Sequence, residues 1–381
     1  MAGITKIVIL DTQSPAVERA DLRAAVSGLR VETCMPGGCH ICTFRVYAPI
    51  TFVPTWVGLG YEVRLYDTLG IFWAGRMTEA MAHRSGGADW WDITAYGFGV
   101  NLDDQLYTSQ DVNGLGTSAI FSAMITALTQ QIDVTTTSGA TSHTLSAAAA
   151  VLLKMLPAKI IAGWLSKFSA DLIWYVYPQD DGDIEVTLKD RPTTADLYIG
   201  LDDIEDYEGG LMGQSYANRV IVEYNAGAAA DTVNDSAAQG AGPTGVGYIR
   251  AAYLYLPEVS QSVDATKAAN ALLSMSSTPR MASHAMELAP GARIIDSNGQ
   301  RVDPWRVRSG QLLQVAGLVT ETAALGELSW NNSCLLVHTS YDEEHDQLSL
   351  VPEGHDMSLD NIVALAASLL KGRHTTARSA S

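Results

Sequence analysis

The sequence contains few cysteines and has no long apolar run. Four cysteines in 381 residues, three of them within residues 34–42, are too few and too clustered to staple a chain of this length. Stability must therefore come from packing and assembly. Apolar runs are short and broken by Gly, Pro, Asp or Ser, and none approaches the roughly 18 residues of a membrane-spanning helix. The sequence predicts no stable membrane insertion.

The N-terminus lacks the features of a secretory signal. Residues 1–10 carry only Lys6 before a short apolar run, and no small-residue cleavage site follows it. We therefore expect a protein that is made and kept in a cytoplasm.

Positive charge is scarce. The chain has 24 basic and 42 acidic side chains, a net charge of -18, and its densest acidic run lies within residues 202–208. Phosphate binding requires an excess of Lys and Arg. The composition therefore argues against a nucleic-acid-binding surface, sequence-specific or not, and against attachment to anionic membranes.

The first hundred residues have the alternation and turn signals of antiparallel β-structure. Residues 42–46 alternate apolar and polar side chains, which is typical of a strand with one buried face. Residues 62–66 and 71–75 flank the turn sequence Asp-Thr-Leu-Gly and predict a hairpin. A further strand is expected at residues 90–96. This spacing suits a small barrel or sandwich.

The pattern then changes to mixed helix and strand. Apolar residues recur at helical spacing within residues 117–132 and 160–168, and strands are expected at residues 172–177 and 184–188. These segments predict a small α/β module.

A second β-rich region follows. Strands are predicted at residues 219–224, 306–315 and 334–338, and a helix at residues 264–275. Residues 226–247 are rich in Ala, Gly, Asp and Ser and contain few large apolar side chains, so we expect a peripheral loop there, either mobile in the isolated protein or ordered only by a neighbour.

A short internal similarity links the two β-rich regions. The sequence Ala-Gly-Arg-Met-Thr-Glu-Ala at residues 74–80 resembles Ala-Gly-Leu-Val-Thr-Glu-Thr at residues 316–322, and each follows an apolar strand. The similarity is compatible with a duplicated domain, although matches of this length also arise by chance.

Several segments occur in an order that is typical of one known family. Residues 63–67, the glycines within residues 70–75 and a strand that ends at residue 97 are similar to the first tube-like domain of phage tail hub proteins. The acidic run that leads to residues 217–222 resembles the start of their second such domain, and residues 308–315 resemble a later strand of it. The family includes baseplate hubs of long-tailed phages, siphophage tail-tip proteins and the hub part of type VI secretion spikes.

The resemblance covers most of residues 30–350 as an order of elements. It implies a structural, non-enzymatic homotrimeric hub that joins the hexameric tail tube or distal tail protein to a threefold tip fibre or spike protein. Such a hub would contact the tape measure protein, close the channel and belong to the virion tail tip after assembly in the host cytoplasm. Three chains with two tube-like domains each would match six tube subunits. The excess acidity would line the ring and keep DNA from adhering.

The expected fold class is a multidomain α+β protein with two tube-like antiparallel β-barrel domains and α/β inserts. Residues 1–105 are expected to form the first tube-like domain and residues 106–200 the α/β module. Residues 201–355 are expected to form the second tube-like domain, with a loop and helix-bearing insert at about 226–300. Residues 356–381 are expected to form a C-terminal helix with a polar tail, either packed on the protein or anchoring the next tail protein.

The cysteine cluster is a local feature that the resemblance does not explain. Cys34, Cys39 and Cys42 have the spacing of the first three ligands of a plant-type iron–sulfur cluster, and His40 adds a candidate zinc ligand. The fourth cysteine, Cys334, is distant in sequence. In a strand, Cys39 and His40 point to opposite faces, and Cys42 falls among inward-facing residues. We therefore expect buried free cysteines without a metal.

The sequence contains no catalytic signature. The eight histidines lie outside any G-x-S-x-G, H-E-x-x-H or C-G-x-C-W element. The carboxylates of residues 202–206 form an acidic run that is more typical of a solvated segment than of a glycosidase pair. No catalytic, cofactor-binding or metal-ligating residue is assigned. The main alternative is a tail-associated cell-wall hydrolase or peptidase; a metal-binding redox module is a third.

Overall fold

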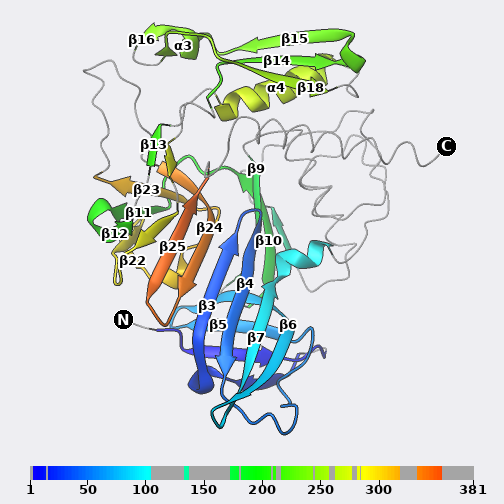
Figure 1. The fold of residues 1–381 in the computed structure, drawn as a ribbon, viewed down its shortest axis with the longest axis vertical. Helices are drawn as coiled ribbons and strands as arrows, with labels where there is room; N and C mark the ends of the chain where they lie inside the picture. The colour runs from blue at the N-terminus through cyan, green and yellow to red at the C-terminus, as the bar shows by residue number, and fades with distance from the viewer. Residues whose placement is uncertain are drawn as a thin grey trace, which may run out of the picture.

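The computed structural model describes residues 3–13, 16–103, 133–136, 172–179, 182–206, 209–211, 216–242, 245–256, 262–276, 281–283, 285–317 and 333–353. The helices expected within residues 117–132, 160–168 and 356–381 lie outside this part of the chain. Most described residues are in strands, and 18 strands belong to one sheet (Figure 1). Among the helices that the structure describes, none has the length and apolar character needed to cross a membrane.

The N-terminal strands pair antiparallel in the spatial order β2–β1–β5–β6–β7–β4–β3. Their bounds are β1 (Lys6–Leu10), β2 (Glu18–Asp21), β3 (Val26–Cys34), β4 (Gly37–Val46), β5 (Glu62–Asp67), β6 (Gly70–Ser85) and β7 (Ala88–Gly97), with the short 3-10 helices η1 (Arg23–Ala25) and η2 (Phe98–Asp103). The alternation in β4 buries Cys42, Phe44 and Val46, and the hairpin expected near residue 70 is confirmed as β5–β6.

The next strands extend this sheet. They are β8 (Asp133–Thr136), β9 (Leu172–Pro178), β10 (Ile184–Asp190) and β11 (Leu197–Gly200). The expected strands β9 and β10 pair antiparallel, and β9 also pairs in parallel with β4 at Gly37 and Gly38. Gly38 has φ +84°, and a Cβ there would overlap the backbone of Val176 in β9. Because glycine has no Cβ, the two strands can approach this closely.

The C-terminal strands complete the sheet. The elements are η4 (Leu201–Asp203), β12 (Ile204–Asp206), β20 (Met286–Leu288), β21 (Ile294–Asp296), β22 (Arg301–Val302), η6 (Pro304–Arg306), β23 (Leu312–Ala316), β24 (Ser333–Asp342) and β25 (Gln347–Pro352). The strand predicted at 306–315 is wrong in its first half, because Arg306 ends a 3-10 turn and the strand begins only at Leu312. Gly310, at φ +85°, lies in the turn before it.

A smaller unit lies at one end of the molecule, apart from the 18-stranded sheet (Figure 1). It consists of β14 (Arg219–Tyr224), η5 (Asn225–Gly227), β15 (Ala229–Asn234), α3 (Ser236–Gln239), β16 (Ala241–Gly242), β17 (Gly245–Val246), β18 (Ala251–Leu256) and α4 (Ser262–Ser276). The order β15–β14–β18 forms one sheet, and the apolar side chains of α4 bury one face of it. Strands β13 (Gly209–Leu211) and β19 (Met281–Ser283) pair separately.

The mobile loop expected at residues 226–247 is wrong for β15. All six residues of β15 pair with β14, from Ala229 opposite Tyr224 to Asn234 opposite Arg219. Asp231 accepts hydrogen bonds from Ser262 and Thr266 of α4. The composition of the segment did not reveal this strand. A strand of small side chains can form where a neighbouring strand supplies the hydrogen-bond partners of its backbone.

The sheet differs from the expected pair of antiparallel barrels. It is mixed, because the pairs β4–β9, β8–β10 and β11–β23 are parallel, and it does not close on itself within the described residues. One hydrophobic core contains side chains from both β-rich regions, including Ile7, Leu65, Leu313 and Leu350. The barrel geometry and the domain boundaries stay predictions.

The two halves of the internal similarity have different local structures. Gly75 lies inside β6, where a Cβ would overlap the carbonyl of Tyr96. Gly317 follows β23 and has φ +92°, and residues 318–322 lie outside the described part of the chain. A shared fold of the two regions therefore stays a prediction that this short motif does not support.

Candidate functional site

The early and late parts of the chain meet along the β3–β24 pair. His338 of β24 lies opposite Cys34 of β3, and the pairing continues to Asp342 opposite Arg30. Beside it, Arg23 forms two hydrogen bonds to the carboxylate of Glu343, at 3.0 and 2.6 Å. We call this junction of β3 with β24 the seam.

A buried polar network lies beneath the seam. The Thr33 and Thr339 hydroxyls are 2.7 Å apart, and the Ser309 backbone N–H donates to Thr33 Oγ1 at 2.8 Å. The Tyr177 hydroxyl lies 2.9 Å from Ser309 Oγ. All four residues are buried. Each polar side chain has a partner, as a buried network requires, and the network ties β3, β9 and β24 together.

Asp67 makes a second connection between the two regions. Its buried carboxylate accepts hydrogen bonds from Arg306 at 2.6 and 2.5 Å and from Trp305 Nε1 at 2.8 Å. Burial alone would raise the pKa of Asp67, but the hydrogen bonds from Arg306 and Trp305 outweigh it and hold the pKa below its usual value. The end of β5 is thereby fixed to η6.

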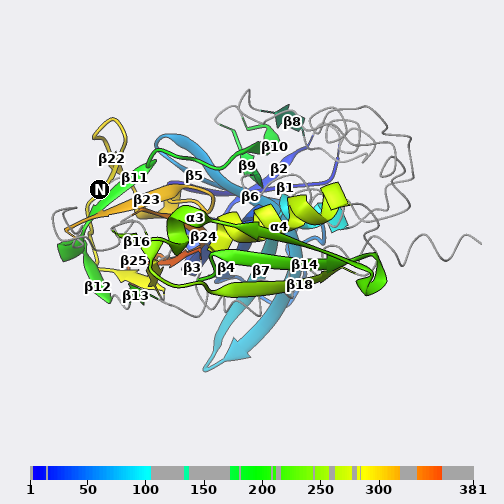
Figure 2. The ribbon, with the colours of Figure 1, turned by 90° about the horizontal axis from the view of Figure 1, so that it is seen from above.

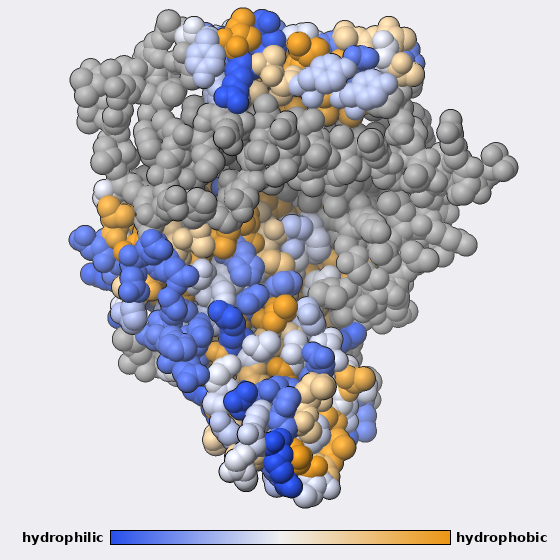
Figure 3. Space-filling view, viewed as in Figure 1, coloured by the Kyte–Doolittle hydropathy of each residue, from blue (hydrophilic) through white to orange (hydrophobic). Residues whose placement is uncertain are grey.

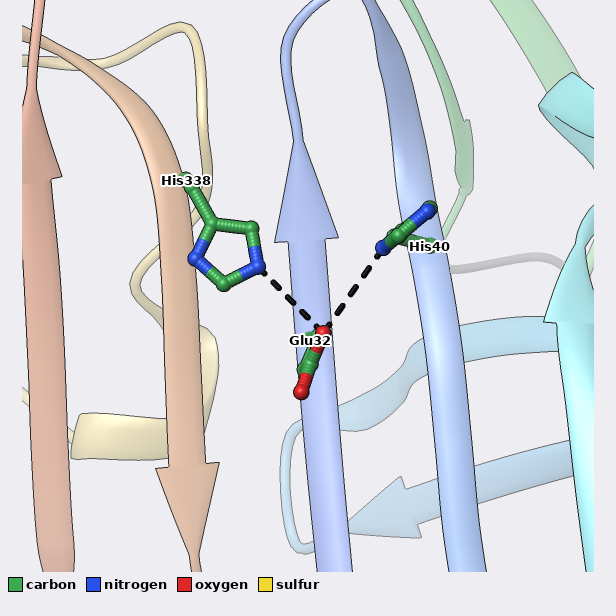
Figure 4. Close-up of side chains that lie close together, drawn as sticks. All are labelled: Glu32, His40 and His338. Carbon is green, nitrogen blue, oxygen red and sulfur yellow. Dashed lines mark hydrogen bonds and ion pairs between the residues drawn. The ribbon is translucent and has the colours of Figure 1, made fainter. Parts of the chain in front are cut away.

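Glu32, His40 and His338 form a cluster on three adjacent strands of the seam (Figure 4). Glu32 Oε2 lies 3.3 Å from His338 Nε2 and 3.7 Å from His40 Nδ1, and all three ligand atoms lie within 4.8 Å of one another. The hydrogen bond with His338 lowers the pKa of Glu32. Among the described residues, no other group of three His, Cys, Asp or Glu side chains has this spacing.

Of these three residues, the sequence singled out only His40, and only as a candidate zinc ligand beside the cysteines. Glu32 and His338 are 306 residues apart, so no spacing motif connects them. Their proximity results from the β3–β24 pairing, which the sequence pattern does not reveal. Cys39 and His40 point to opposite faces of β4, as predicted, and His40 is the one that faces outward.

Two of the four cysteines, Cys39 and Cys42, face away from this cluster. Both are buried in the core, Cys42 by the alternation of β4 and Cys39 because the register of β4 shifts between them. Burial raises the pKa of Cys34 to about 11 and of Cys39 and Cys334 to about 12, and raises the pKa of Cys42 well above its usual value. Protonated thiols are poor nucleophiles and poor ligands. The absence of a metal at the cysteines stays a prediction.

The remaining candidate groups are dispersed. His83 lies 3.3 Å from Asp92 and stacks on Trp90, and His345 lies 3.1 Å from Asp342. His143, His284, His355 and His374 lie outside the described residues. Asp202, Glu205 and Asp206 of the acidic run are exposed, in keeping with a solvated segment.

Exposed apolar side chains gather at the end of the molecule opposite the smaller unit, where Figure 3 shows orange surface. The segment between β4 and β5 exposes Tyr47, Phe52, Val53 and Leu59. The far end of the β6–β7 hairpin, which exposes Met81, projects from the body (Figure 2). Exposed apolar side chains that gather on one part of a surface are typical of protein contacts.

The fold matches those of solved phage tail proteins over nearly the whole chain. The 43 kDa tail protein of prophage MuSo2 from Shewanella oneidensis has a TM-score of 0.58 at 11% identity, with 91% of this chain and 98% of that chain covered. The tail protein from Neisseria meningitidis MC58 has a TM-score of 0.57 at 10% identity, with 94% and 99% covered. Prophage tail protein gp18 from Listeria monocytogenes EGD-e has a TM-score of 0.57 at 10% identity, with 97% and 100% covered.

No protein-family model and no curated protein sequence matches the chain. The sequence has therefore diverged where the fold has not. The expected resemblance to phage tail proteins is confirmed at the level of the fold: the chain has the fold of these solved phage tail proteins.

Proposed function

We propose that the protein is a structural hub of a bacteriophage tail tip or baseplate. The observation that carries the proposal is the shared fold with three phage tail proteins along 91–97% of this chain and 98–100% of theirs. A match over almost the full length of both chains supports the same kind of part in a tail.

The proposed assembly is a homotrimer. It joins the hexameric tail tube or distal tail protein to a threefold tip fibre or spike, contacts the tape measure protein and closes the channel. Three chains that each supply two β-rich regions provide six units, so one face can match the hexamer while the other keeps threefold symmetry. The sharing of one core by both regions supports their acting as one rigid piece of such a ring.

The proposed position of the protein is the virion tail tip, after assembly in the host cytoplasm. Its role there is mechanical, and the excess acidity is proposed to face the channel. A net charge of -18 per chain would repel DNA from the wall of a ring that the genome has to pass.

The oligomeric state tests this function. Light scattering coupled to size-exclusion chromatography should give the mass of three chains, and imaging of assembled tails should locate the protein at the tip with threefold symmetry. A monomer or dimer in the assembled particle would contradict the hub. A zymogram on cell walls separates the alternative: clearing of peptidoglycan by the purified protein would favour a hydrolase.

A further inference from the structure

Neither the packing of the fold nor the proposed function makes use of the Glu32–His40–His338 cluster. It lies on the outer face of the sheet, where each of the three side chains is partly exposed. We propose that these three side chains form a zinc site, with Glu32 Oε2, His40 Nδ1 and His338 Nε2 as ligands and water in the fourth position.

The distances suit a tetrahedral ion. With metal–ligand bonds of about 2.1 Å, neighbouring ligand atoms in a tetrahedral zinc site are about 3.4 Å apart. The two carboxylate–imidazole distances are 3.3 and 3.7 Å. The two imidazole nitrogens lie within 4.8 Å of each other, and small rotations of the rings, which are 77° apart, bring them closer.

A β-bulge directs His40 towards Glu32. Val31 pairs with Cys42 and Thr33 pairs with Cys39, so two residues of β4 lie opposite the single residue Glu32 of β3. A bulge of this kind re-aims a side chain and is frequent beside functional sites. Without the extra residue, the alternation of β4 could not bury both Cys39 and Cys42 and still turn His40 outwards beside Glu32.

The Nδ1 atom of His40 supplies independent support. It is shielded from solvent and has no hydrogen-bond partner among the described residues. A buried polar atom without a partner is costly and calls for an explanation. A metal ion between His40 and Glu32 would provide the missing interaction.

The donor set favours zinc over the harder cations. Two neutral imidazoles and one carboxylate are the ligands of many zinc sites, whereas magnesium and calcium prefer oxygen alone. Glu32 supplies the carboxylate of this donor set. Bound zinc would fasten β24 to β3 and β4 across the seam.

Zinc binding to the full-length, tag-free protein tests the site directly. After removal of metals by dialysis against a chelator, calorimetric titration should show one zinc ion per chain, and zinc should raise the thermal midpoint. His338→Ala and His40→Ala should each weaken zinc binding by more than about 100-fold. Loss of a residue that only supports a ligand weakens metal binding by up to about 100-fold, and loss of a ligand itself should cost more. His345→Ala is the matched control, because His345 lies beside a single carboxylate, Asp342, and should leave binding unchanged.

Circular dichroism of each apo variant establishes that it is folded, and cobalt absorption in the visible range reports tetrahedral coordination independently. The proposal is overturned by the absence of saturable zinc binding in the unaltered protein, or by equal affinity in the folded His338→Ala variant. Loss of binding in the Cys34→Ser/Cys39→Ser double variant, with retention in His338→Ala, would assign the metal to the cysteines and overturn it too. None of these outcomes depends on tail assembly.

Discussion

At the residue scale, the buried carboxylate of Asp67 links the two β-rich regions. It accepts a bidentate pair from Arg306 and a third hydrogen bond from Trp305, about 240 residues later in the chain. Bidentate pairs of this kind are geometrically specific, and the loss of one partner leaves the other charge buried without a counter-charge. Asp67 therefore fixes how the late segment docks on the early sheet.

We expect Asp67→Asn to lower the free energy of unfolding by about 3 kcal/mol, because Arg306 is left partly buried without its counter-charge. Urea denaturation measures the loss. The matched control is Asp89→Asn, which breaks the exposed pair with Arg84. Exposed pairs contribute little, so equal shifts of the urea midpoint in the two variants would show that burial of Asp67 has no special effect.

The same variant predicts a dependence on pH. The pKa of Asp67 in the folded protein lies below its usual value of 3.8. Its stabilising effect is therefore fully present above the unfolded pKa and is lost as the pH falls through the lower, folded value. The difference in unfolding free energy between the unaltered protein and Asp67→Asn should stay constant from about pH 5 to 7 and shrink below about pH 4. A difference that grows on acidification would contradict this assignment.

At the element scale, the parallel pairing of β4 with β9 depends on the close approach at Gly38. We expect Gly38→Ala to destabilise the protein more than Gly87→Ala, measured by urea denaturation. Both glycines have φ +84°, but a Cβ at Gly87 would meet nothing within 4 Å, whereas one at Gly38 would overlap Val176. Gly87→Ala thus measures the backbone strain alone, about 1 kcal/mol. Equal losses of unfolding free energy in the two variants would mean that β9 can move away from β4 without destabilising the protein.

Strand β15 provides a second prediction at this scale. We expect the backbone amides of Ala229–Asn234 that pair with β14 to be protected from hydrogen exchange in the isolated protein. The protection should resemble that of β18, on the other side of β14. Amide exchange as fast as in an unfolded peptide would instead support the mobile loop predicted from the composition.

Local patterns account for the elements that the sequence predicted. The alternation of β4, the turn between β5 and β6, and the apolar stripe of α4 are all readable within about ten residues. The seam, the β4–β9 pair and the strand β15 depend on partners far away in sequence. For that reason nothing in the sequence indicated that Glu32 and His338 lie together, and each reads as an ordinary strand residue.

At the scale of the whole molecule, the two β-rich regions share one core, and the smaller unit has a core of its own. We expect the two β-rich regions to unfold in one cooperative transition, since neither can lose its packing without the other. Hydrogen exchange in denaturant should show equal opening free energies for β3 and β24. Earlier opening of β24 alone, with β3 still protected, would indicate two independent domains.

The seam also has a consequence for synthesis. Strand β3 is complete once the first 34 residues are made, yet its partner β24 begins at Ser333. During translation, one edge of the early sheet therefore stays without its native neighbour until nearly the whole chain has left the ribosome. An open edge can pair with strands of other chains. The edge is covered only when β24 pairs with β3.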